Sequence, residues 1–323
     1  MGLSTLETVL LQLRPDSLNL VLAELDILSL LRFSRSSTCL RSIYFCYKET
    51  AWDPVKSYQR WFNHPAAFRR LLRRTNAVIS GSFALQFFDR SYYPDSDMDI
   101  YLRCAGAMDV CRWLTTEGYR YVKSDKSYKH VPLQHQGHIQ KAVKNNSTLN
   151  RPLLGVYNFK KTLASSTGYI EQLLIQVIVV DIDPIEHILF GFHSTAVINF
   201  LTADDAISVF PRSTFIHRLS YISSTQLGNS NRFPTWRSKY ERRGFTFMDG
   251  FSRPNNHFLV TGPRFVMDRF CWHIHFRNEP FRDLKRPYYG DHNLKLHFEI
   301  LTRSSGVVAE GAYIRVAEPL IWR

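Results

Sequence analysis

The stretch from 76 to 103 constrains the fold most, because its hydrophobic pattern changes twice within a short distance. The run NAVIS (76–80) is short and mostly apolar, FALQFF (83–88) follows a glycine–serine pair, and MDIYLR (98–103) alternates in polarity. Short apolar or alternating runs are typical of strands, whereas a longer apolar run after a glycine turn favours a helix. The stretch therefore predicts a buried strand, a helix that begins at the turn, and a second strand.

The segments that follow extend this alternation of strands and helices. Residues 107–118 have helical spacing and end at Gly118, a residue type that commonly terminates helices. The runs 119–123 and 172–180 predict further strands, and 194–209 predicts a helix. The sequence therefore predicts an α/β (α+β) fold, in which helices flank a mixed sheet.

Three other segments complete the expected organisation of the second half. Polar residues dominate 124–167, which predicts a loop or a hairpin. Asp183 followed by Pro184 predicts the N-terminus of a helix that continues through Phe190. The last third alternates aromatic and basic residues and predicts short strands.

The N-terminal part of the chain predicts helices. Apolar residues recur at helical spacing through 5–48, with a break at Pro15. The segment LAELDILSLLRFSRSSTCLRSIY (22–44) resembles the later part of an F-box, and its alternative is a helical prefix that packs on the next domain. Residues 56–74 predict a helix with Pro65 as an internal restart. Its four arginines, Arg69, Arg70, Arg73 and Arg74, predict either a solvated face or a nucleic-acid contact.

These patterns divide the chain into three parts. We expect an F-box-like helical segment over 1–55, a core over 56–211, and a basic region of short strands and helices over 212–323. The net charge is +13, from 41 lysines and arginines against 28 acidic residues, and most of the excess lies in the last part. An excess of this size favours acidic partners such as RNA or nucleotide phosphates.

Cysteines and hydropathy indicate an intracellular location, in cytoplasm or nucleus. Five cysteines without C-x-x-C spacing argue against a disulfide framework and against a zinc knuckle. The N-terminus lacks the basic-then-apolar order of a signal peptide. The most apolar window, LLIQVIVVDIDPIEHILFGF (173–192), is interrupted by acidic residues and a proline, so we expect no membrane span.

Four residues in the opening stretch have the chemistry of a nucleotide and metal site. A glycine at position 81 permits a sharp turn, and the Ser82 hydroxyl with the N-terminus of the following helix can bind phosphate oxygens. Asp97 and Asp99 are two apart on one strand, so their carboxylates face the same side and can share divalent metals. Asp95 precedes the strand in a Pro-Asp-Ser turn, which indicates a turn residue rather than a ligand.

Gly81-Ser82 followed by Ser96-Asp97-Met98-Asp99-Ile100 resembles the nucleotidyltransferase superfamily, the polymerase-beta-like group that includes poly(A) polymerases and CCA-adding enzymes. The resemblance implies NTP as substrate and Mg²⁺ or Mn²⁺ as cofactor, with Asp97 and Asp99 as catalytic metal ligands and Gly81 and Ser82 at the phosphates. The later runs HSTAVINFLTADDAISVFP and SKYERRGFTF are similar to a group of fungal proteins with such a core, some with an F-box-like prefix. Tyr240, Arg242, Arg243 and Gly244 match a motif of that group without a known role.

The family supplies a third carboxylate from a neighbouring strand, and this sequence departs from the pattern there. The only mid-strand polar residue of 172–180 is Gln176, which carries no charge and cannot act as a base. Asp181 and Asp183 at one end of that run, and Glu171 at the other, are alternatives that need a shifted register. The departure falls on the residue that would activate the acceptor hydroxyl.

Histidines offer weaker signals. His193 is expected to be a hydrogen-bonded core histidine rather than a ligand, and His135 with His138 to be loop histidines, because no cysteine or carboxylate has suitable spacing. Two functions therefore stay open from the sequence. One is a metal-dependent nucleotidyltransferase, and the other a catalytically degenerate nucleotidyltransferase fold that acts as a binding or adaptor module. A genuine F-box would link the second to a Skp1-like partner and ubiquitin ligases.

Overall fold

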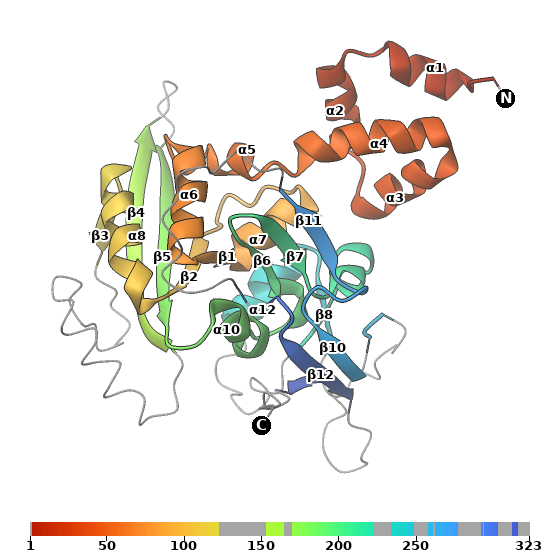
Figure 1. Ribbon diagram of the computed structural model, residues 1–323. Helices are drawn as coiled ribbons and strands as arrows, with labels where there is room; N and C mark the ends of the chain where they lie inside the picture. The colour runs from red at the N-terminus through yellow and green to blue at the C-terminus, as the bar shows by residue number, and fades with distance from the viewer. Residues whose placement is uncertain are drawn as a thin grey trace.

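The computed structural model describes most of the chain, namely residues 2–122, 153–164, 170–222, 234–248, 258–260, 262–276, 292, 294–302 and 312–315, the backbone alone for 164, 234, 301–302 and 312–315. In this part of the chain an eight-stranded sheet is covered by helices, and two smaller sheets pack beside it (Figure 1). The first four helices project from the sheet at the upper right of the view. The predicted mixed α/β architecture is therefore confirmed.

The main sheet has the strand order β11-β7-β6-β1-β2-β5-β4-β3. The pair β2–β5 is parallel and the other neighbouring pairs in this sheet are antiparallel. Its strands are β1 (Val78–Ser80), β2 (Met98–Arg103), β3 (Arg120–Val122), β4 (Leu153–Ala164), β5 (Ile170–Val180), β6 (Asn199–Leu201), β7 (Asp205–Ser208) and β11 (Trp272–His275). The central strand β2 spans the residues that the alternating pattern predicts.

Both faces of the central strands are buried, because successive side chains point to opposite sides. Ile100 and Leu102 belong to the larger core, together with residues of the helices α5 (Pro54–Tyr58), α6 (Pro65–Thr75), α7 (Gly81–Asp89) and α8 (Cys104–Thr116). Tyr101 belongs to a second core on the other face, with α10 (Pro184–Gly191) and residues of the C-terminal strands. The face of Tyr101 is also the face of Asp99, two residues away.

The N-terminal segment forms four helices: α1 (Thr5–Gln12), α2 (Pro15–Ala23), α3 (Ile27–Ser36) and α4 (Thr38–Ala51). Proline at position 15 separates the first two, as predicted, because it occupies the first position of α2. Two side chains tie the segment to the core. The Trp52 indole donates a hydrogen bond to the Phe88 carbonyl (3.2 Å), and Arg90 donates to the Tyr47 hydroxyl (2.6 Å).

In its described residues, the C-terminal part adds further strands and the helix α12. The smaller elements are β8 (Leu219–Tyr221), β9 (Thr246–Met248), β10 (Gly262–Phe265), β12 (His297–Thr302), β13 (Ala312–Arg315), α12 (Pro234–Glu241), and the short turns η2 (Thr195–Val197) and η3 (Arg212–Ile216). Strand β11 pairs with β7 of the main sheet. The boundary expected between 211 and 212 therefore runs through a continuous sheet.

The helix predicted over 194–209 is wrong. The segment forms η2, β6 and β7, and Thr202 closes the turn between the two strands. Its hydroxyl accepts hydrogen bonds from the N–H groups of Asp204 (3.2 Å) and Asp205 (3.0 Å), a local side-chain turn that competes with helix. Segment 124–167, predicted as a loop or a hairpin, contains β4, which pairs antiparallel with β5, and 123–152 lies outside the described residues.

Candidate functional site

Gly81 begins α7 in a backbone conformation that favours glycine. Its φ is +68°, in the left-handed region. The carboxylate of Asp99 lies directly over the position of the missing side chain. A Cβ added to Gly81 would clash with Oδ2 of Asp99 and would lie 3.2 Å from its Cγ. The glycine is therefore required both for the turn and for the close approach of the aspartate.

Asp99 is placed by the pairing of three strands. It lies opposite Ser80 on β1 and opposite Gln176 on β5. Its Oδ1 is buried and has no hydrogen-bond partner within the described part of the chain. Burial, and then the nearby charge of Asp97, raise the pKa of the Asp99 carboxyl well above its usual range. Asp97 lies just before β2 rather than on it, and its charge acts on the buried Asp99 carboxyl in a setting that disfavours two negative charges.

The residue across the sheet from Asp99 is a neutral amide. Gln176 is its register partner on β5, and the Gln176 Nε2 donates a hydrogen bond to Oδ1 of Asn158 on β4 (3.0 Å). The predicted position of Gln176 beside the aspartate pair is thus confirmed. Each amide uses one of its polar atoms in this hydrogen bond, and neither side chain can carry a negative charge.

The alternative carboxylates lie elsewhere. Asp181 follows β5 five residues beyond Gln176, which is roughly 16 Å along an extended strand. Asp183 caps α10 by accepting a hydrogen bond from the N–H of Ile185 (2.8 Å). Glu171 pairs with Arg60 (2.5 Å). Asp181, Asp183 and Glu171 are therefore excluded as the third carboxylate, because each is distant from Asp99 or bound in another structural role.

Helix α12 brings a positive charge to the aspartates. The Lys239 Nζ lies 3.4 Å from Oδ1 of Asp97. Tyr240, the next residue, places its hydroxyl 3.3 Å from the hydroxyl of Ser82. The Ser82 side chain is consequently buried, and only 2% of the residue is exposed. One helix thus contacts one expected metal ligand, Asp97, and the expected phosphate-binding serine.

Arg243, just beyond α12, completes this contact. It donates hydrogen bonds to the Ser82 hydroxyl (3.0 Å) and to Oδ1 of Asp95 (3.1 Å). Its guanidinium lies over the ring of Tyr93, 4.1 Å from the centroid, and its side chain is 5% exposed. Asp95, interpreted from the sequence as a turn residue, therefore has an arginine partner. Gly244 ends this segment with φ +83°, which agrees with a helix-terminating glycine.

Sequence reasoning missed the role of Lys239 and Arg243. The motif around Tyr240 was visible, but nothing local to it indicates a partner more than a hundred residues away. The signal that could have located it is charge. A lysine and an arginine flank a buried tyrosine, in a chain where two neighbouring aspartates need a counter-charge.

The histidine predictions have different outcomes. His193 is a hydrogen-bonded histidine as predicted, since its Nδ1 lies 2.9 Å from the Ser194 hydroxyl and its ring stacks on Trp236 at 4.0 Å. Burial, and then the charge of Lys239, lower the pKa of His193 to about 3, so the ring is neutral. His135 and His138 lie outside the described residues.

The arginine face of α6 is mostly engaged with acids rather than solvated. Arg73 pairs with Asp204, and Arg74 pairs with Asp109 at 3.1 Å. Arg69 is buried and donates a hydrogen bond to the Ala203 carbonyl (2.6 Å). The predicted solvated face is therefore wrong for most of its members. Much of the basic region 212–323, the predicted RNA contact, lies outside the described residues.

Comparison with known proteins assigns no family to this chain. No family model matches it, and neither a curated protein nor a solved structure matches it significantly. Within the described residues, no helix combines the length and the apolar character needed to cross a membrane.

Proposed function

We propose that this chain is a catalytically degenerate nucleotidyltransferase-like protein that acts as a binding or adaptor module. Support for the relationship comes from the local arrangement. A strand leads into Gly81 and a helix, Asp97 lies just before the next strand, and Asp99 lies on it with its carboxylate against the glycine. This is the arrangement that the resemblance implies for an NTP and metal half-site.

The observation that carries the degenerate assignment is the neutral amide pair of Gln176 and Asn158 beside Asp99. Two-metal transfer needs carboxylates that hold the metals and a base for the acceptor hydroxyl. An amide supplies neither a charge nor a base. Lys239 adds to the argument, because its ammonium already neutralises Asp97 from a position that a metal would have to share.

Calorimetric titration of the full chain tests this proposal. Mg²⁺ or Mn²⁺ is titrated with and without each NTP, and transfer from labelled NTP is followed separately. We expect the wild type to transfer no label. We also expect NTP to cause no metal binding that depends on Asp97 and Asp99, so the variant Asp97→Asn with Asp99→Asn should give the same titration as the wild type. The variant Gln176→Asp, which places a carboxylate beside Asp99, is expected to raise Mn²⁺ affinity by about tenfold or more. Incorporation of label by the wild type, lost in the double aspartate variant, would refute the degenerate assignment.

One observation favours the alternative, a metal-dependent nucleotidyltransferase. Asp99 keeps a buried oxygen without a hydrogen-bond partner among the described residues, and its pKa is raised. A divalent cation would relieve both the repulsion from Asp97 and the desolvation of that oxygen. Mg²⁺ or Mn²⁺ would then be held by these two aspartates. The same titration decides, because this alternative requires tight metal binding by the wild type without Gln176→Asp.

The adaptor role is supported by apolar side chains on the N-terminal helices. Leu6 on α1 is 55% exposed and Leu20 on α2 is 71% exposed, and Phe45 on α4 is also exposed. Exposed apolar residues gathered on a small segment indicate a protein contact. We propose that this segment, 1–55, binds a Skp1-like partner as an F-box does.

Pull-down of the full chain with purified Skp1 tests the adaptor role. Leu6→Glu combined with Leu20→Glu is expected to abolish capture, because buried charge is costly at an apolar interface. Ile170→Glu is the matched control, since Ile170 is an equally exposed apolar residue on β5, outside the segment. Absence of capture by the wild type would refute the F-box assignment and leave the degenerate assignment standing.

A further inference from the structure

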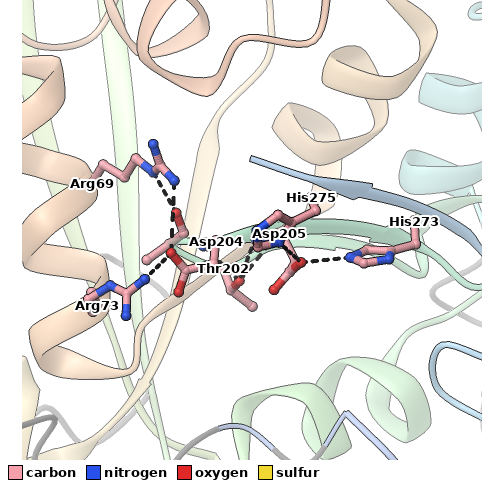
Figure 2. Close-up of polar contacts among 8 residues, drawn as sticks. Arg69, Arg73, Thr202, Asp204, Asp205, His273 and His275 are labelled. Atoms are coloured by element: carbon pink, nitrogen blue, oxygen red, sulfur yellow. Dashed lines mark hydrogen bonds and ion pairs between the residues drawn. The ribbon is translucent and has the colours of Figure 1, made fainter. Parts of the chain in front are cut away.

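A histidine and carboxylate cluster lies on the main sheet, away from the aspartate pair. His273 and His275 are two residues apart on β11, so both point to the same face. Antiparallel pairing with β7 places Asp205 directly opposite His275. The Asp205 Oδ1 lies 2.6 Å from the Nε2 of His273 and 2.9 Å from the Nδ1 of His275 (Figure 2). Three ligand atoms, one from each residue, lie within 4.8 Å of one another.

The cluster is held by the backbone rather than by a loop. The Asp205 N–H donates to the Thr202 hydroxyl, and its carbonyl accepts from the Thr202 N–H at 2.8 Å. On β11 the intervening residue, Ile274, is buried in the larger core and fixes the strand from its opposite face. Because paired strands fix the backbone of all three residues, only their side chains have to rotate to receive a metal, which lowers the cost of binding.

A neighbouring acid leaves Asp205 available to a cation. Figure 2 shows Arg69 and Arg73 directed at Asp204 and not at Asp205. Arg73 pairs with Asp204, and the Arg69 Nη2 lies 3.8 Å from the same carboxylate. The partners described for the Asp205 carboxylate are the two imidazoles. In that arrangement both ring nitrogens donate to the carboxylate. A metal would take the place of those two protons, each of which would move to the other nitrogen of its own ring.

From this geometry we propose that Asp205, His273 and His275 form a binding site for a borderline divalent metal such as Zn²⁺. Two imidazoles and one carboxylate are the ligand set preferred by Zn²⁺, Co²⁺ and Ni²⁺ over Mg²⁺ and Ca²⁺. The site is open on one side, since the His275 side chain is 59% exposed. A cavity of about 390 Å³ lined by His275 and Arg69 adjoins it. An open three-ligand set leaves a coordination position for water or for an exchangeable ligand.

This site is distinct from the metal site implied by Asp97 and Asp99. Strands β6 and β1 separate β7 from β2 in the sheet. The two sites also differ in chemistry, because oxygen ligands alone favour Mg²⁺ or Mn²⁺. The zinc proposal does not depend on the proposed function and survives its failure.

Titration of the full chain with Zn²⁺, followed by calorimetry, tests the proposal. We expect one Zn²⁺ per chain that is lost in His273→Ala with His275→Ala. Asp205→Asn keeps the shape of the side chain, and should weaken binding by at least about tenfold. Two variants should bind Zn²⁺ as the wild type does. They are Asp97→Asn and His64→Ala. His64 is a matched control because its Nδ1 lies 2.7 Å from a carboxylate, that of Glu117, but it is not one of the three residues of the cluster.

Co²⁺ provides an independent spectroscopic measurement. Visible absorption bands of Co²⁺ bound at low coordination number should appear with the wild type and disappear with the double histidine variant. Circular dichroism and the urea midpoint of each variant establish that it folds, and Asp205→Asn serves if the double variant does not. The proposal is overturned if the wild type binds no Zn²⁺, or if the folded variants bind Zn²⁺ and Co²⁺ as tightly as the wild type.

Discussion

Replacing Gly81 by alanine should destabilise the protein by about 2–5 kcal/mol. The first contribution is the backbone, because φ +68° costs a residue with a Cβ about 1–2 kcal/mol. The second is steric, because the new methyl group would overlap Oδ2 of Asp99 and force it to move. Overpacking of this kind costs roughly 1–3 kcal/mol. The sum is a large part of the stability of a typical domain, about 5–15 kcal/mol.

A double-mutant cycle separates these two contributions. In an Asp99→Ala background the clashing oxygen and the Cγ are gone, and the contact with residue 99 that remains is its Cβ, at 3.6 Å from the new methyl group. That distance is an ordinary van der Waals contact, so only the backbone cost of about 1–2 kcal/mol remains. The double variant should therefore lose about 1–3 kcal/mol less stability than the sum of the losses of the two single variants.

Equilibrium urea unfolding of the four proteins, followed by tryptophan fluorescence, measures the cycle. Gly244→Ala is the matched control, since Gly244 has φ +83° and a Cβ there would meet nothing within 4 Å. It should cost the backbone contribution alone. Effects that add to within about 0.5 kcal/mol would show that Asp99 does not lie against Gly81. A Gly244→Ala cost equal to that of Gly81→Ala would refute the steric contribution.

Three further predictions concern charges and stability, all measured by urea unfolding. Asp99→Asn should raise the free energy of unfolding at pH 7. Because the native carboxyl holds its proton more tightly than the unfolded one, the gain should shrink as the pH falls and be lost below about 4, the pKa of an unfolded Asp, where the wild-type carboxyl becomes protonated in both states. The wild type should lose stability below about pH 6.5, because the native His193 imidazole, with a pKa of about 3, stays neutral while the unfolded one binds a proton. His193→Phe should reduce this loss, and an unchanged pH profile would contradict the prediction. Asp268→Ala should cost about 3–5 kcal/mol, since it leaves Arg264, paired at 2.8 Å with both side chains buried, without its counter-charge; a loss under about 1 kcal/mol would contradict this.

Local patterns were sufficient to predict the elements around the glycine–serine turn. The bounds of β2 follow from its alternation, and the start of α10 follows from Asp183 and Pro184, whose side-chain oxygen and fixed φ both favour a helix N-terminus. Gly118 was expected to end a helix, and it follows α8 with φ +87°. In each of these places one or two residues determine the backbone without help from distant contacts.

The hairpin of β6 and β7 could not be predicted from its apolar pattern. Phe200 is buried in one core and Leu201 in the other, so the strand lacks the polar face that distinguishes strand from helix. Its identity depends on β1 and β11, which pair with the two strands from distant parts of the chain. Where both faces are buried, tertiary pairing decides the structure.

The candidate sites also differ in whether local patterns could place their residues. Gln176 could be placed beside Asp99 because both lie on strongly patterned strands of one sheet. Lys239 and the zinc ligands could not be placed. The His-x-His spacing of β11 is visible in the sequence, but its partner Asp205 is identified only by the pairing of β7 with β11. Similarly, nothing near Asp97 predicts that a lysine from α12 will face it.

Under the proposed function, these contacts give the aspartates a structural role. Asp97 and Asp95 anchor the α12 segment through Lys239 and Arg243, and Ser82 accepts a hydrogen bond from the same arginine. The acids that would bind metal therefore hold a helix, and the cations of that helix take the charge that the metal would supply. A divalent ion at Asp97 would compete with Lys239 for the carboxylate and weaken one of the contacts that hold α12. Metal binding and helix docking are consequently competing uses of the same carboxylates.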